Sequence, residues 1–171
     1  MKRIIVITLL AMVLLGVGCV KIDKLSELTV MTGEINVDYI SLDKMEYDLL
    51  GDSKDIFKST FEQYEVSDLK YIKSGEVITL DFGKEQPDKI VIKDDMLDPK
   101  GDFIYDDKLT REVQFTEENG KYHFTVEKHL ASGLGAVFSE TAIDGYRVNA
   151  FWGDEEYVYT FVIITDSYMT V

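Results

Sequence analysis

The sequence predicts a mainly β protein, a two-sheet sandwich with one or two short helices in its N-terminal half. Between residues 76 and 166, apolar side chains recur at every second position, which is the period of a strand with one buried face. Short acidic or glycine-containing turns separate these runs, as they do in all-β sandwiches. The clearest turn is Asn119-Gly120, a dipeptide typical of tight hairpins.

The expected strands differ in how regular their alternation is. In residues 145–152 the face that carries Tyr146 is apolar throughout, so we expect Trp152, on that face, to be mostly buried. Residues 157–165 are apolar on both faces, which predicts a central strand covered on both sides. The looser alternation in residues 34–42 could form an early strand. From residue 76 onward the ranges expected as strands are 76–82, 89–93, 111–116, 121–130, 145–152 and 157–165.

Residues 53–64 are expected to form a short helix. Ser53 can cap its N-terminus. Phe57, Phe61 and Tyr64 follow at helical spacing and fall on one face. We expect this aromatic stripe to pack on the sheet; the alternative is a helix that binds a partner.

The N-terminus has the features of a bacterial secretion signal. Lys2 and Arg3 give a positive start, and residues 4–18 follow with Thr8 as their only polar side chain. This apolar run is shorter than the ~20 residues that a helix needs to cross a bilayer. We therefore expect residues 1–18 to be a signal peptide and not a permanent membrane span.

Residues 15–19, Leu-Gly-Val-Gly-Cys, resemble the lipobox of bacterial lipoproteins, in which small residues precede a cysteine that is acylated and becomes the new N-terminus. Cys19 is the only cysteine of the chain, so it has no intrachain disulfide partner, and acylation would account for it. The resemblance implies lipidation at Cys19, a lipidated tether over residues 19–30 and attachment to the extracytoplasmic face of the cell membrane. Residues 31–171 are then expected to form a single β-sandwich domain, clearest over residues 76–166.

Residues 76–166 also resemble the immunoglobulin-like domain of small bacterial lipoproteins, a mostly uncharacterised group of mainly Gram-positive type. The segments that carry the resemblance are 87–92, Asn119-Gly120 with Tyr122, 145–148, 152–154, and Tyr157, Tyr159 and Phe161. The resemblance implies an immunoglobulin-like β-sandwich. It brings no catalytic residues, and a fold alone does not imply a function.

The charge of the chain restricts its partners. Removing residues 1–18, which include Lys2 and Arg3 and no acidic residue, changes the formal charge from -14 to -16. Such a charge opposes binding to nucleic acid and to anionic membrane surfaces. The predicted function is therefore that of a lipid-anchored, non-enzymatic interaction module of the cell envelope, with an envelope protein as its partner. No cofactor and no catalytic residue is expected.

An acidic segment over residues 94–107 gives an alternative function, that of a ligand- or calcium-binding envelope lipoprotein. Its carboxylates could supply oxygen ligands to calcium, and the candidates are Asp94, Asp95, Asp98 and Asp102, with Asp106 and Asp107 further along. Their spacing does not fit the Asp-x-Asp-x-Asp-Gly loop of known calcium sites. We therefore expect a solvated acidic loop.

A third possibility is a secreted hydrolase. The chain has two histidines, His123 and His129, and serines such as Ser132 and Ser139, but no Gly-x-Ser-x-Gly elbow. In a continuous strand the histidines would lie about 20 Å apart at ~3.3 Å per residue, so we expect two surface histidines that share no metal. Residues 133–136, Gly-Leu-Gly-Ala, resemble a nucleotide-binding loop only in part and are expected to be a flexible connection.

Overall fold

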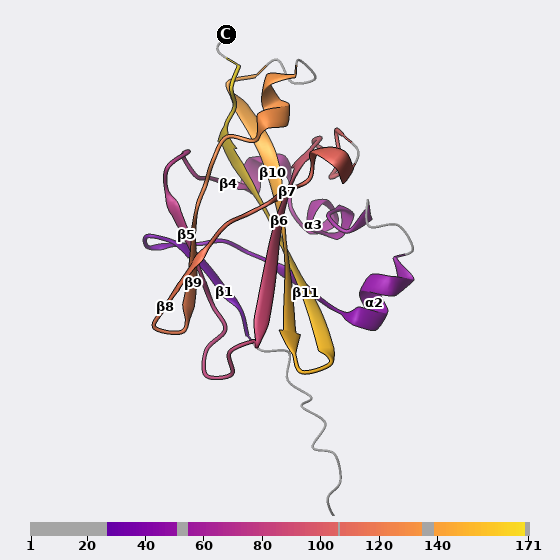
Figure 1. Cartoon of the computed structure of the whole chain (residues 1–171). Helices are drawn as coiled ribbons and strands as arrows, with labels where there is room; N and C mark the ends of the chain where they lie inside the picture. The colour runs from indigo at the N-terminus through magenta and orange to yellow at the C-terminus, as the bar shows by residue number, and fades with distance from the viewer. Residues whose placement is uncertain (1–26, 51–54, 106, 135–138, 170–171) are drawn as a thin grey trace, which may run out of the picture.

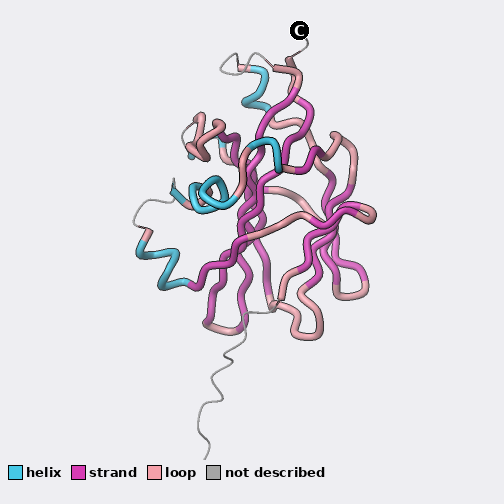
Figure 2. The backbone as a smooth tube through the Cα atoms, turned by 180° about the vertical axis from the view of Figure 1, so that it is seen from behind, coloured by secondary structure: helices cyan, strands magenta, loops and turns pink. Residues whose placement is uncertain are grey.

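The computed structural model describes residues 27–50, 55–105, 107–134 and 139–169. Two β-sheets pack face to face, and short helices lie along the outer side of the second sheet (Figures 1 and 2). The prediction of a mainly β sandwich with two short helices in the N-terminal half is confirmed.

The first sheet has five antiparallel strands in the order β2-β1-β5-β9-β8. Their bounds are β1 Thr29–Thr32, β2 Ile35–Asn36, β5 Val77–Asp81, β8 Thr116–Glu118 and β9 Lys121–Thr125. β8 and β9 form the predicted hairpin, in which Glu118 pairs with Lys121. The two residues between them, Asn119 and Gly120, have φ values of 54° and 73°. Asn and Gly adopt such left-handed values more readily than other residues, which explains why this dipeptide makes the turn.

The second sheet has the order β3-β11-β10-β6-β7, and the short strand β4 pairs in parallel with β11. The bounds are β3 Ile40–Asp43, β4 Lys70–Tyr71, β6 Lys89–Leu97, β7 Arg111–Glu112, β10 Thr141–Trp152 and β11 Glu155–Asp166. β10 and β11 pair along their whole length, from Thr141 with Asp166 to Trp152 with Glu155.

The helices are short and connect or cover the strands. The α-helices are α2 Lys44–Leu49 and α3 Lys58–Gln63, and the 3-10 helices are η2 Val66–Asp68, η3 Asp107–Leu109 and η4 Leu130–Gly133. α2 begins with a capping box, in which the Asp43 carboxylate accepts from the Glu46 backbone N–H at 2.8 Å and the Glu46 carboxylate accepts from the Asp43 N–H at 3.1 Å.

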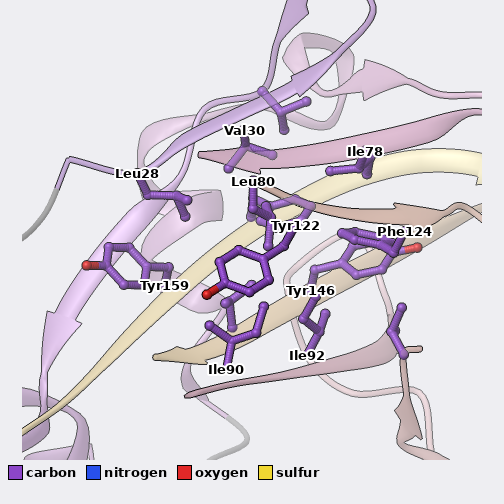
Figure 3. Close-up of a cluster of buried hydrophobic side chains, with 14 of the residues drawn as sticks. Leu28, Val30, Ile78, Leu80, Ile90, Ile92, Tyr122, Phe124, Tyr146 and Tyr159 are labelled. Carbon is purple, nitrogen blue, oxygen red and sulfur yellow. The ribbon is translucent and has the colours of Figure 1, made fainter. Parts of the chain in front are cut away.

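The main core lies between the two sheets. Alternate residues of the facing strands point into it, and Figure 3 shows members of both sheets meeting there. The first sheet supplies Leu28, Val30, Ile78, Leu80, Tyr122 and Phe124, and the second supplies Ile90, Ile92, Tyr146, Val148, Tyr159, Phe161 and Ile163. At about 25 cal/mol per Å² of apolar area removed from water, this layer is the main source of stability.

A second core covers the outer face of β10 and β11. Val158 and Val162 of β11 point into it and meet Phe57, which precedes α3, and Leu97 of β6. Both faces of β11 are therefore buried, and the prediction of a central strand covered on both sides is confirmed. The aromatic stripe of the predicted helix packs here as expected, through Phe57 and Phe61.

Two predicted strands each cross from one sheet to the other. The run 34–42 gives β2 in the first sheet and β3 in the second. The run 111–116 gives β7 in the second sheet and the beginning of β8 in the first. The strands in the first sheet, β2 and β8, are exposed at every residue, so the alternation of these two runs does not mark a buried face there.

Other boundaries differ from the prediction for local reasons. β9 ends at Thr125, well before residue 130, because β5, the strand that pairs with this end of it, begins at Val77, opposite Thr125. α3 begins at Lys58, after Phe57 as its N-cap residue without a side-chain cap, and Ser53 lies outside the described residues. Trp152 lies at the end of β10 and packs edge-on against Phe82 and Tyr157, and the prediction that most of its side chain is buried is confirmed.

Gly145 gives a test of how tightly β10 is held against the second core. A Cβ at this position would lie 2.6 Å from Leu97 Cδ1 and 2.8 Å from two ring atoms of Phe57. Gly145→Ala should therefore lower the free energy of unfolding by about 1–3 kcal/mol, the range for an overpacked core. Urea unfolding would measure it.

Gly133→Ala is the matched control, because a Cβ there would meet only Tyr168 Cβ, at an ordinary 3.6 Å. It should change the free energy of unfolding by less than about 0.5 kcal/mol. Equal effects of the two variants would contradict the packing described here.

Candidate functional site

The acidic segment does not form a solvated loop over its whole length. Asp94 and Asp95 lie within β6 and are buried, so the prediction is wrong for these two residues. β6 continues past the predicted residue 93 because β10 pairs with it as far as Leu97. Consecutive residues of a strand point to opposite faces, so the two carboxylates diverge.

Each of the four aspartates predicted as weak calcium ligands has a different role. Asp98 accepts hydrogen bonds from the backbone N–H groups of Lys100 and Asp102, at 2.7 and 3.0 Å, and so forms a turn. The remaining partners are Arg111 for Asp94, the Thr110 hydroxyl for Asp95 and Lys58 for Asp102. In the part of the chain that the structure describes, no group of three or more His, Cys, Asp or Glu side chains is arranged to hold a metal ion. Asp106 lies outside that part.

Asp94 belongs to a polar cluster at one end of the space between the sheets. Arg111 of β7 donates from Nε, at 3.1 Å, and from Nη2 to Oδ2 of Asp94. Its Nη1 donates to Oε2 of Glu127 at 2.6 Å. Asp94 is fully buried and the Glu127 side chain is mostly exposed. Arg111 therefore joins an interior carboxylate to a surface one, which a planar guanidinium with several N–H donors does well.

A second carboxyl group, that of Asp144, lies beside Asp94. Tyr146 of β10 pairs directly with Asp94 of β6, and Asp144 lies two residues before Tyr146 on the same face of the strand. All three side chains are fully buried. Within the described residues, the two carboxyl oxygens of Asp144 have no hydrogen-bond partner. The Tyr146 hydroxyl has none there either. The cluster thus holds two buried carboxyl groups beside one guanidinium.

Burial shifts the protonation of this cluster. It raises the pKa of Asp94 to about 7, although the charge and hydrogen bonds of Arg111 oppose the shift. Burial also raises the pKa of Asp144 well above its usual value, and the nearby Asp94 carboxylate raises it further. Leaving an uncompensated charge in the interior costs several kcal/mol, so protonated Asp144 is the favoured form near pH 7. Carboxyl groups with such shifted pKa values mark candidate functional sites.

The void nearest to the cluster in the sequence is too small for a substrate. Its volume is about 10 Å³, and it is lined by residues that include Asp95, Thr110 and His129, of which the first two adjoin Asp94 and Arg111 in the chain. This is room for about one water molecule. The site therefore suits the binding of a proton better than the turnover of a substrate.

His129 is buried, so the prediction of a surface histidine is wrong for it. Its Nδ1 accepts a hydrogen bond from the Ala131 N–H at 3.2 Å and so caps η4. Burial, followed by the positive charge of Arg111, lowers the pKa of His129. His123 is half-buried on β9, and its Nδ1 lies 3.0 Å from the Thr79 hydroxyl.

The serines do not form a catalytic pair with these histidines. Ser132 is fully buried, and its Oγ accepts a hydrogen bond from the Tyr168 N–H at 3.0 Å. Ser139 Oγ accepts one from the Thr141 N–H at 3.3 Å. Each hydroxyl thus organises the backbone near the end of the sandwich. Cys19, the predicted lipidation site, and residues 135–136 of the glycine-containing segment lie outside the described residues.

The same end of the sandwich exposes a group of apolar side chains, which we call the apolar end. It consists of Tyr71, Leu130, Leu134 and Tyr168, with exposed fractions of 50%, 72%, 63% and 52%. Tyr168 joins η4 through its backbone and has the Lys128 ammonium 5.7 Å from its ring centre. Tyr71 Oη donates to the Asp166 carboxylate at 2.6 Å, at the end of β11.

A groove of about 560 Å³ adjoins the apolar end on the outer face of the second sheet. Leu97, Phe103 and Ile143 are among the apolar residues that line it. Ile164 also lines it and pairs in register with Tyr71. The groove therefore continues the exposed apolar surface along the sheet.

Comparisons with family models, with curated proteins and with solved structures find no match to this chain. Among the described residues, no helix is long and apolar enough to cross a membrane. The candidate site is therefore assigned from geometry alone.

Sequence reasoning missed Arg111, Glu127, Asp144 and Tyr146 as members of one cluster. A weak signal was present for Asp144, because extending the alternation of residues 145–152 backwards places it on the Tyr146 face. The same extension of residues 89–93 places Asp94 on the inward face of Ile92. An acidic residue at an inward position of a strand requires a partner and is thus a signal for a buried site.

Removing the guanidinium tests the buried pair. Arg111→Met keeps an apolar stem of similar length but leaves Asp94 without its cation, so the free energy of unfolding should fall by about 3–5 kcal/mol. Urea unfolding at pH 8, where Asp94 is mostly charged, would measure the change.

Lys121→Met is the control, because Lys121 and Asp81 form a surface pair at 2.9 Å. Exposed pairs of this kind contribute about 0–1 kcal/mol. A loss at Arg111 no larger than the loss at Lys121 would show that the buried pair does not stabilise the fold.

Proposed function

We propose that this protein is a lipid-anchored, non-enzymatic module of the cell envelope that binds an envelope protein through the apolar end. Lipid on Cys19 would hold it to the outer face of the membrane. The apolar end, exposed on a chain that is otherwise strongly acidic, is the observation that carries the proposal.

The arrangement of the two ends supports this function. The described chain begins at the lower end of the sandwich in Figure 1, near the hairpin between β10 and β11. η4 and the C-terminal segment lie at the upper end. A tether that precedes residue 27 would therefore leave the apolar end directed away from the membrane, where a protein can reach it.

Chemistry favours a protein over a lipid surface as the occupant. The expected mature charge of -16 repels anionic lipid headgroups. Two tyrosines and two leucines beside a lysine combine apolar area with polar atoms, a composition common at protein interfaces. Tyrosine contributes a large rigid contact area at a small entropic cost.

The geometry gives no support to a hydrolase. Ser132 and His129 are both engaged with backbone groups, and the void beside His129 has room for about one water molecule. A nucleophile needs its base within hydrogen-bond reach and space for a substrate. Binding of a protein partner therefore explains this end of the molecule better than hydrolysis of a substrate does.

The anchor can be tested at Cys19. Cys19→Ser should abolish labelling with a radioactive fatty acid and release the protein from the membrane fraction, because no other cysteine is present to carry the lipid. Ser26→Ala should keep both properties. Label retained on Cys19→Ser would place the attachment elsewhere.

The contact surface can be tested with paired substitutions in living cells. A photo-crosslinking residue at position 168 should capture a discrete partner whose association survives 0.5 M salt, whereas the same residue at position 154, in the β10–β11 turn, should not. Leu130→Asp with Leu134→Asp should reduce that capture at least tenfold, because charge is expensive in an apolar interface. Both leucines are exposed, so folding should be unaffected.

Met45→Asp with Leu49→Asp is the matched control. These α2 side chains are as exposed as the two leucines, with exposed fractions of 68% and 78%, but they do not belong to the apolar end. Capture should be unchanged. An equal loss with the α2 pair, or capture that disappears in 0.5 M salt, would contradict the proposed surface.

A further inference from the structure

We propose that Asp94 and Asp144 form a proton-binding site that holds the η4 end of the sandwich closed and loosens it when the proton is lost. The proton is the ligand, and the two carboxyl groups with the Tyr146 hydroxyl are the site. The site would bind a proton whether or not the protein is anchored to a membrane or bound to a partner.

The strand register brings the groups together. Asp94 and Tyr146 are directly paired, and Asp144 is the next residue on the same face of β10. Diagonal neighbours in an antiparallel sheet lie roughly 7 Å apart, close enough for two carboxyl groups in a poorly solvated interior to interact strongly. Both are fully buried, and one oxygen of Asp94 and both of Asp144 lack a hydrogen-bond partner among the described residues.

The charges around the pair favour one bound proton. Of the groups acting on Asp94, Arg111 of β7 is positive, and Asp95 and Glu127 are acidic. For Asp144 the acting groups are Asp94 and Arg111, and on β11 the uncharged Ile163 lies directly opposite. His129 faces the backbone carbonyls of Asp94 and Leu109 with a lowered pKa, so it adds no charge at neutral pH. One guanidinium shared with Glu127 cannot balance two ionised carboxylates in the interior.

The hydrogen bonds of Arg111 determine which segment of the chain loosens when the proton is lost. Arg111 ties β6, through Asp94, to the segment that leaves β9, through the Glu127 carboxylate and the Glu127 backbone carbonyl. His129, which caps η4, follows two residues later. Loss of the proton would draw water and Arg111 towards two buried charges. The segment expected to loosen is η4, because its cap residue His129 lies against the Asp94 backbone and follows Glu127, the other partner of Arg111.

The sign of the pH effect is opposite for the two kinds of group. The pKa values of Asp94 and Asp144 are raised in the folded protein, so their contribution to stability is present at acidic pH and is lost as pH rises, for Asp94 through about 7. The pKa of His129 is lowered, so its contribution grows as pH rises. A fall in stability between pH 5.5 and pH 8 therefore reports on the aspartates.

Thermal unfolding of the full-length protein tests the site. The melting temperature should be several degrees lower at pH 8 than at pH 5.5, and Asp144→Asn, which mimics the protonated side chain, should remove most of that difference. Asp154→Asn makes the same charge change in the exposed β10–β11 turn and should keep the difference. A melting temperature that rises with pH, or an unchanged difference in Asp144→Asn, would overturn the proposal.

Two measurements on the unsubstituted protein keep the proposal testable if the variant does not fold. Two aspartate carboxyl carbons should titrate above pH 6 by nuclear magnetic resonance, and their absence would overturn the proton site. Amide hydrogen exchange of residues 126–134, corrected for the intrinsic pH dependence, should be at least tenfold faster at pH 8 than at pH 5.5. Unchanged protection of this segment would overturn the coupling to η4.

Discussion

The structure depends on the pairing of β10 with β11, the longest pair of strands in the described chain. Their register runs without interruption from Thr141 with Asp166 to Trp152 with Glu155. One face of the pair makes the main core with the first sheet, and the other face makes the second core with Phe57 and its neighbours. Every other element of the second sheet is added to one side of this pair, through β6 or through β3 and β4.

This central pair also determines where polar groups can be buried. Its inward face is apolar in the middle, at Val148, Ala150 and Phe161, whereas the inward positions near the start of β10 carry Asp144 and Tyr146. A buried carboxylate lowers stability unless it is paired or protonated. Arg111 compensates Asp94, and Asp144 has no comparable partner among the described residues. The sandwich is therefore held by apolar contacts at its centre and by a pH-dependent balance of charges at the η4 end.

Local patterns were enough to predict most of the fold. The two-residue alternation of β10 and β11 and the Asn119-Gly120 turn are properties of adjacent residues, which sequence reasoning can detect. The crossings of residues 34–42 and 111–116 between sheets were not predictable, because alternation is the same in either sheet. The candidate site was missed because it is formed by residues that are far apart in sequence: Arg111 pairs with Asp94, and Asp144 lies beside Asp94. A run of aspartates suggested a loop, and only the register shows that the first two are inside a strand.

The polar cluster lies close in sequence to the exposed side chains of the apolar end. Glu127, which receives one arm of Arg111, is three residues before Leu130, a member of the apolar end. Ser132, within η4, holds the backbone of Tyr168, another member. The charged groups that favour or oppose opening of this end therefore act on the segments that carry its exposed side chains. A purely structural role would be met as well by an apolar pair at positions 94 and 144, which often stabilises a fold more than buried charge does. Retaining two carboxyl groups there makes the order of the apolar end depend on a proton, and this dependence is a property that an apolar core cannot supply.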